Sequence, residues 1–358
     1  MSMNRLLFIL SLAFTPFIGA QAGPLVLGKD DHICLIGNTL PERMQHFGYF
    51  ESLVHARYPE HQLVVRNLGF SADELELRSR SLDFGDADHH LTKEKADVIL
   101  AFFGLNESFD GEGGLERFAI QLDTFIKDTL GKNFNGKTAP RLAIVSPIAY
   151  EGGGGRPSDR EVNRQLSLYT DVMRATTAEH PSVTFVDLFE PTLELLAPKG
   201  DLTENGIHLT EDGYAKLAPM LDQGLFGAEG AAAKVDEKLR AEVNEKSCQY
   251  FHRYRAVNGY YIYGGRSKLR FDPDKSFTNA DVMERERQVL DEMCANRDQR
   301  IWAVAQGKEV SEEIDDSNVS PFIEVKSNFG SGSNDGKEGS VAYLKPEETL
   351  KKLTLGRG

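Results

Sequence analysis

The sequence is poor in the features that several classes of protein require. Its 358 residues include only three cysteines and no CxxC or CxxCH motif, which argues against a zinc ribbon or a covalent haem, and no cofactor is expected. Asp and Glu outnumber Lys and Arg by 55 to 41, and the net charge of −14 disfavours nucleic acid or an anionic membrane as a main partner. What remains is the composition of a globular protein, 40% hydrophobic and 27% charged.

The N-terminus reads as an export signal. Arg5 supplies a positive start, the apolar stretch Leu6–Ala13 follows, and Ala20-Gln21-Ala22 offers a small-x-small cleavage pattern. A membrane anchor is the alternative, but Pro16 and the short apolar length favour a signal peptide at residues 1–22. No later apolar run reaches the ~20 residues of a membrane helix, so we expect an exported chain, periplasmic or secreted, with no membrane span once the signal is removed.

The cysteines and one His-Asp cluster are the remaining candidates for covalent or metal chemistry. Cys34 lies inside an apolar run and is expected to be buried. Cys248 and Cys294 could pair in an oxidising compartment, although the sequence does not show that they meet. The stretch Asp86–His90 has no third ligand at useful spacing, which favours a surface loop over a metal site.

Short apolar segments alternate with amphipathic segments over residues 23–227. The segments with β-strand character are 32–36, 63–67, 98–103, 142–145 and 184–187, and most are apolar on both faces, as in parallel strands covered by helices. Helical patterns occupy 42–57, 114–130, 159–180 and 211–221. This alternation predicts an α/β domain, a three-layer doubly wound (flavodoxin-like) fold with a parallel five-stranded sheet, in which ligands bind beyond the carboxyl ends of the strands.

The character of the sequence changes after residue 227. Residues 228–325 are expected to form a mainly helical and aromatic C-terminal extension, with helices at 231–254 and 279–300, followed by a flexible linker and tail at 326–358. Two interpretations of the extension stay open. It could pack back on the α/β domain, or residues 231–300 could form an interface to a protein partner in a larger exported assembly.

Four motifs carry the chemistry of the α/β domain. LIGNTL ends the first predicted strand, RNLGFSADEL follows the second, AFFGLNESF follows the third, and NGIHLTEDGY precedes the last helix. In order and spacing these motifs resemble the four blocks of the SGNH (GDSL-like) hydrolase family, over about 200 residues from Asp30 to Phe226. Gly-x-Asn after an apolar strand and the run Gly-Ile-His-Leu-Thr are the most specific parts of this resemblance.

The resemblance implies a role for each matching residue. Thr39 would take the place of the nucleophile and His208 that of the general base, with Asn205 in the position that supports the base. The oxyanion would be held by the backbone N–H groups of Thr39 and Gly69 and by the side chain of Asn106.

Two positions depart from the family pattern. The family's Asp-Ser reads Asn38-Thr39 here, and the Asp of its Asp-x-x-His block reads Asn205. The branched Cβ of Thr39 crowds the path of attack, and Thr39 could instead serve as a helix N-cap. Asn205 could accept a hydrogen bond from His208, but it cannot stabilise an imidazolium ion by charge.

The resemblance therefore implies an exported ester hydrolase with a modified catalytic site. Small acyl esters are the expected substrates, with acetylated carbohydrate as the natural candidate. The alternative is a catalytically inactive SGNH-like module that binds carbohydrate or another ligand. An ester-release assay would separate the two interpretations.

Overall fold

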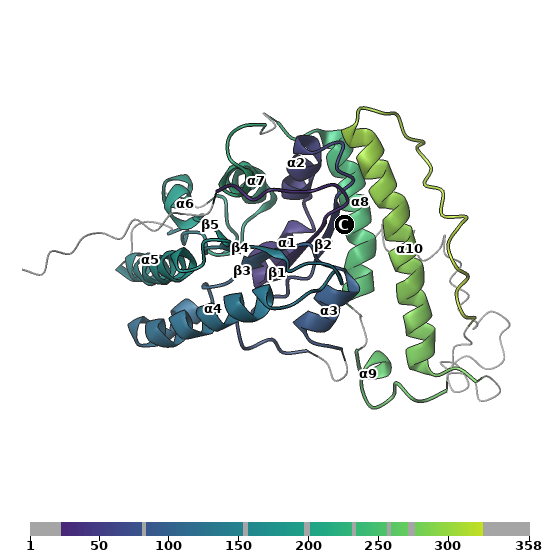
Figure 1. Cartoon of the computed structure of the whole chain (residues 1–358), viewed down its shortest axis with the longest axis horizontal. Coiled ribbons are helices and arrows are strands. Elements are labelled where there is room, and N and C mark those ends of the chain that lie inside the picture. The colour runs from purple at the N-terminus through teal and green to yellow at the C-terminus, as the bar shows by residue number, and fades with distance from the viewer. Residues whose placement is uncertain are drawn as a thin grey trace, which may run out of the picture.

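Figure 1 shows the fold, which comes from a computed structural model of the chain. The structure describes residues 23–80, 84–152, 157–196, 201–230, 234–255, 259–270 and 276–324. The predicted signal peptide at residues 1–22 and the predicted tail at 326–358 lie outside these ranges.

Five strands form a single parallel sheet in the order β2-β1-β3-β4-β5. Their bounds are His32–Gly37 for β1, Val64–Asn67 for β2, Val98–Phe102 for β3, Arg141–Val145 for β4 and Thr184–Val186 for β5. The chain runs from β1 outward to β2 and then returns to the other side of β1, so the strand order reverses between β1 and β3. The predicted doubly wound α/β fold is confirmed.

The strands are readable from the sequence because the sheet is buried on both faces. All five residues of β3 are buried. Val98, Leu100 and Phe102 belong to one hydrophobic core. Ile99 and Ala101, whose side chains point to the opposite face, belong to the other. A strand placed between two cores has to be apolar at every position.

Helices cover both faces of this sheet. Figure 1 shows α2 and α7 on one side and α3 and α4 on the other. The bounds are α1 Thr39–Met44, α2 Tyr49–Arg57, α3 Ala87–Lys93, α4 Leu115–Leu130, α5 Pro157–Ala178, α6 Phe189–Leu195, α7 Glu211–Phe226, α8 Glu237–Tyr254, α9 Gly259–Ile262 and α10 Asn279–Ala305, with 3-10 turns η1 at Glu107–Asp110 and η2 at Glu112–Gly114.

The predicted helix at 42–57 is wrong, because two helices occupy that stretch. Gly48 separates α1 from α2 with a φ of 69°, and a side chain there would lie 2.6 Å from Oδ1 of Asn244. The short helices α3 and α6 were not predicted. The expected surface loop at Asp86–His90 is wrong as well, because Asp86 caps α3 and His90 is buried.

The extension packs on the α/β domain. Figure 1 shows α8 and α10 side by side at the end of the sheet where β2 lies. Nζ of Lys246 lies 2.8 Å from the carboxylate of Glu51 and donates to the carbonyl oxygen of Val65 in β2 at 3.0 Å. Nε1 of Trp302 donates to the carbonyl oxygen of Leu63 at 2.8 Å. The inner faces of α8 and α10 therefore cover the sheet's edge strand, as the first interpretation of the extension expects.

The structure also bears on the predicted cysteine pair and on membrane-spanning helices. Cys294 is a buried free thiol, so the disulfide with Cys248, which the sequence left open, is not formed. Burial raises the pKa of Cys294 to about 12. Within the described ranges, no helix is both long enough and apolar enough to cross a membrane.

Candidate active site

The turn after β1 sets the position of Thr39. Gly37 has a φ of 121°, and a Cβ at this residue would lie 2.0 Å from the carbonyl oxygen of Phe102, so only glycine fits. Oδ1 of Asn38 accepts a hydrogen bond from the N–H of Leu40 at 3.0 Å and thereby caps α1. The N-cap reading of Thr39 is therefore wrong. Thr39 is the first residue of α1, and its N–H points out of the helix end.

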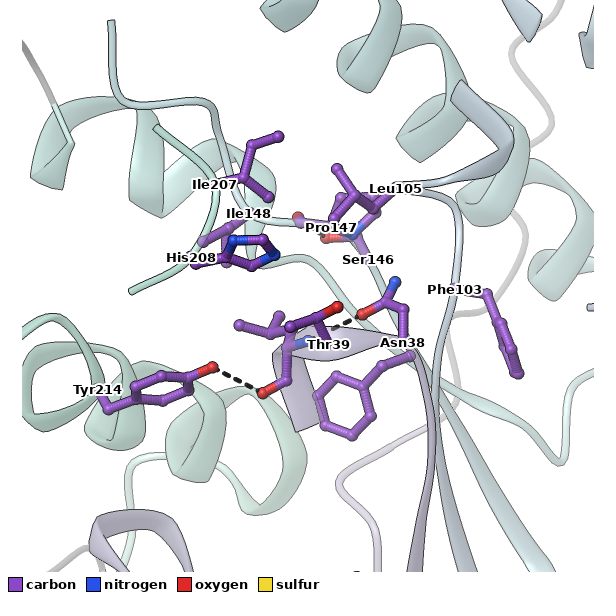
Figure 2. A pocket seen from close by; sticks show the side chains of 12 residues that line it. Asn38, Thr39, Phe103, Leu105, Ser146, Pro147, Ile148, Ile207, His208 and Tyr214 are labelled. Carbon is purple, nitrogen blue, oxygen red and sulfur yellow. Dashed lines mark hydrogen bonds between the residues drawn. The ribbon is translucent and has the colours of Figure 1, made fainter. Parts of the chain in front are cut away.

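Thr39 and His208 line the same pocket, although 169 positions separate them in the sequence. Figure 2 shows the imidazole and the threonine side chain facing each other. The pocket encloses about 340 Å³, part of it open to solvent. Its lining residues are mainly apolar and comprise Asn38, Thr39, Leu40, Phe102, Phe103, Leu105, Ser146, Pro147, Ile148, Ile207, His208 and Tyr214.

The hydroxyl groups of the pocket differ in what they can do. Among the described residues, the Thr39 hydroxyl makes no hydrogen bond to His208, so it is not held as an activated nucleophile. Oγ of Ser146 accepts from the N–H groups of Leu188 at 2.8 Å and Phe189 at 3.1 Å, and it therefore serves to cap α6. The Tyr214 hydroxyl donates to the carbonyl oxygen of Leu40 at 2.9 Å, and burial raises its pKa.

A buried carboxylate holds the loop that carries His208. Glu151, which follows β4 and is 4% exposed, accepts hydrogen bonds from the N–H groups of Leu202 at 3.1 Å and Thr203 at 2.8 Å. It also accepts from the Thr203 hydroxyl at 2.5 Å. The N–H of Glu151 donates to the carbonyl oxygen of Gly206 at 2.8 Å. These hydrogen bonds hold the backbone of residues 202–206, which leads to His208, in one conformation.

The side chain of Asn205 sets the tautomer of His208. Its Oδ1 accepts from the N–H groups of Ile207 at 3.2 Å and His208 at 3.0 Å. The amide nitrogen is therefore the atom that faces Nδ1 of His208, at 2.9 Å. Because an amide nitrogen only donates, Nδ1 accepts, and the proton of the neutral ring sits on Nε2. The expectation that Asn205 accepts a hydrogen bond from His208 is wrong, since the bond runs the other way.

This tautomer is the opposite of the one that a general base needs. A histidine that removes a hydroxyl proton through Nε2 must carry its own proton on Nδ1 and donate it to a supporting acceptor. With Nδ1 engaged by Asn205, the remaining ring nitrogen of His208 is a donor. The resting site therefore offers donors to a ligand but no base to Thr39.

Gly69 lies outside the pocket lining. Its N–H donates to Oδ1 of Asn67 at 3.0 Å and is therefore already used. A Cβ at Gly69 would lie 2.8 Å from the backbone nitrogen of Glu42, so glycine is required here for the packing of α1. The prediction that the Gly69 N–H holds an oxyanion does not fit this arrangement.

Asn106 also lies outside the pocket lining, although its neighbour Leu105 contributes to it. The residue sits in the turn before η1, where its carbonyl oxygen accepts from the N–H of Phe109 at 3.2 Å. Its part in oxyanion binding stays a prediction.

Asn38 is the pocket residue that the sequence reasoning passed over as a ligand-binding group. It is 2% exposed and its amide nitrogen points into the pocket (Figure 2). The signal was present in the sequence. An Asn in place of the family's Asp carries a hydrogen-bond donor that Asp lacks.

The sequence profile of the GDSL-like lipase/acylhydrolase family matches residues 44–216. The matched stretch begins at the end of α1 and ends within α7, so it lies inside the α/β domain and covers just under half of the 358 residues. No curated protein matches the chain.

Three solved structures are similar to the chain. BT4096, a gut microbial diltiazem-metabolizing enzyme, is 17% identical to this chain with a TM-score of 0.44. The alignment covers 58% of this chain and 49% of that protein, so this chain spans about half of its length. LAE5, an alpha/beta hydrolase enzyme from the metagenome of Lake Arreo, is 16% identical with a TM-score of 0.43, covering 56% of this chain and 96% of that one. A catalytic mutant of Axe2, an acetylxylan esterase from Geobacillus stearothermophilus, is 18% identical with a TM-score of 0.44, covering 58% and 99%. These likenesses concern the fold alone.

Proposed function

We propose that the chain is an exported hydrolase of small acyl esters with a modified catalytic site, and that acetylated carbohydrate is its substrate. The observation that supports this proposal most directly is that Thr39 and His208 line one pocket beyond the carboxyl ends of β1 and its neighbours. The apolar lining and small size of the pocket favour a short acyl group such as acetyl. Export rests on the signal-like sequence of residues 1–22.

In the proposed reaction, the Thr39 hydroxyl attacks the carbonyl carbon of the ester while its proton passes to His208. The tetrahedral oxyanion then collapses, and the departing alcohol takes that proton. A water molecule hydrolyses the acyl-threonine, which restores the hydroxyl and releases the carboxylic acid. A second route, in which His208 activates a water that attacks the ester directly, applies if Thr39 is too crowded to react.

Both routes need the minor tautomer of His208. Moving the ring proton to Nδ1 would place an N–H against the amide nitrogen of Asn205, so two donors would face each other and a hydrogen bond would be lost. The reactive tautomer is therefore rare, and turnover is expected to be slow.

The test is acetate release by the purified chain from 4-nitrophenyl acetate and from acetylated xylo-oligosaccharides. His208→Ala should abolish turnover. His180→Ala is the matched control, because His180 pairs with Asp123 of α4 and does not line the pocket. Equal activity in the wild type and in His208→Ala would refute the proposal.

A second candidate function is favoured by the direction of the Asn205–His208 hydrogen bond. A pocket that offers donors and lacks a base suits a module that binds a carbonyl or sugar oxygen without turnover. Saturable binding of acetylated xylo-oligosaccharide with no acetate release would support this candidate.

For either function, a protein partner would contact the outer faces of α8 and α10, because the inner faces pack on the α/β domain.

A further inference from the structure

We infer that the side-chain amide of Asn38 is the donor that holds the ester carbonyl oxygen as it becomes an oxyanion. This inference rests on the proposed function and assigns Asn38 a role that the sequence had given to Gly69 and Asn106. Neither of those two residues lines the pocket, and the N–H of Gly69 is bound to Oδ1 of Asn67. The pocket therefore needs another donor beside the N–H of Thr39.

The orientation of the Asn38 amide is fixed by the fold. Oδ1 accepts from the N–H of Leu40 at 3.0 Å in a buried hydrogen bond that caps α1. Flipping the amide would set its NH2 group against that N–H and remove the cap. The backbone is anchored as well, since the N–H of Asn38 donates to the carbonyl oxygen of Phe102 at 3.2 Å. The amide nitrogen must therefore point away from the helix.

That nitrogen has no acceptor among the described residues and is open to the pocket. Asn38 is 2% exposed, and within the part of the chain that the structure describes its hydrogen bonds involve Oδ1 and the backbone but not Nδ2. Figure 2 shows the NH2 end directed into the pocket. A donor that is held in a fixed orientation toward a pocket and has no acceptor in the protein is available to an oxygen atom of a ligand there.

The neighbouring residue completes the arrangement. Thr39 follows Asn38 directly, and its N–H points out of the N-terminal end of α1. The two donors come from one rigid turn, beside the hydroxyl that attacks the ester. Preorganised donors of this kind stabilise the charge that develops on the oxygen, and removing one of them typically lowers turnover by ~10²–10³.

Two substitutions separate this role from helix capping. Asn38→Asp keeps the oxygen that caps α1 but replaces the pocket-facing NH2 group with an acceptor. Asn38→Ser keeps a capping oxygen and removes the donor. We expect both variants to lose ~10²–10³ in kcat/KM for 4-nitrophenyl acetate with an unchanged urea midpoint. Activity within threefold of the wild type in both variants would overturn the inference.

A binding measurement keeps the inference testable if the wild type releases no acetate, in which case the proposed function itself fails. Sodium acetate is titrated into the 15N-labelled chain, and the side-chain NH2 signals of Asn38 are followed by NMR. We expect a saturable shift of these signals that is absent from Asn67, whose amide donates to the carbonyl oxygen of Pro41. Unchanged Asn38 signals through the titration would overturn the role of this amide.

Discussion

Under the proposed function, Asn205→Asp should raise the rate of ester hydrolysis. One carboxylate oxygen can keep the hydrogen bonds from the N–H groups of Ile207 and His208, at 3.2 and 3.0 Å in the native chain. The other oxygen would replace the amide nitrogen that now lies 2.9 Å from Nδ1 of His208. Because a carboxylate only accepts, the ring proton would move to Nδ1 and leave the lone pair of Nε2 available to Thr39.

The size of the gain follows from the reverse change in serine proteases, where replacing the triad Asp by Asn lowers turnover by ~10⁴. Asn205 is exposed, so solvent screens the new charge more than in a buried triad. We therefore expect a rise in kcat/KM of ~10²–10³, which corresponds to about 3–4 kcal/mol of transition-state stabilisation.

The assay is the hydrolysis of 4-nitrophenyl acetate by the wild type, Asn205→Asp and Asn205→Ala. The Ala variant removes the amide donor without supplying an acceptor, so it should not reach the activity of the Asp variant. A folded Asn205→Asp variant whose kcat/KM stays within threefold of the wild type would show that the His208 tautomer does not limit turnover.

Three further predictions concern the nucleophile, the loop and the pH dependence of stability. Thr39→Ser should raise kcat about tenfold, because it removes the methyl group beside the hydroxyl. Thr39→Ala should be inactive. Full activity in Thr39→Ala would show that a water molecule attacks the ester instead. Glu151→Ala should lower the free energy of unfolding in urea by about 3 kcal/mol, because three donors lose a buried acceptor, and the same loss in the exposed control Glu190→Ala would count against this role. Burial lowers the pKa of His90 from 6.5 to about 3, so the unfolded chain binds more protons between these values and stability should fall as the pH drops below 6.5. The slope should approach about 1.4 kcal/mol per pH unit in urea melts and flatten in His90→Gln, and an identical slope in both proteins would contradict it.

The strands of the sheet could be predicted because their sequence patterns are typical of buried parallel strands. A strand buried on both faces, such as β3, is apolar throughout, and the structure places every strand end within one residue of the prediction. The break at Gly48 was missed because its cause is distant in the sequence. The glycine packs against Asn244 of α8, and no local pattern records that contact. The seven-residue helices α3 and α6 are too short to show a period of 3.6 residues.

The site could be predicted only in part. Motif order placed Thr39 and His208 beyond the strand ends, and they line one pocket. The direction of the Asn205–His208 hydrogen bond was beyond the sequence, because an amide side chain can donate or accept and two backbone N–H groups decide which end faces the ring. The hydrogen bond from the Gly69 N–H to Asn67 could have been predicted from the sequence, because an Asn two residues earlier is typical of an Asx-turn.

Neutral His208 carries its proton on Nε2 because the amide nitrogen of Asn205 donates to Nδ1. Two-bond 1H–15N correlation spectra of the 15N-labelled chain at neutral pH report the tautomer directly, since the protonated and unprotonated ring nitrogens resonate far apart. We expect an unprotonated Nδ1 and a protonated Nε2 for His208, with the pattern reversed in Asn205→Asp. A wild-type ring with its proton on Nδ1 would show that Asn205 does not donate to His208.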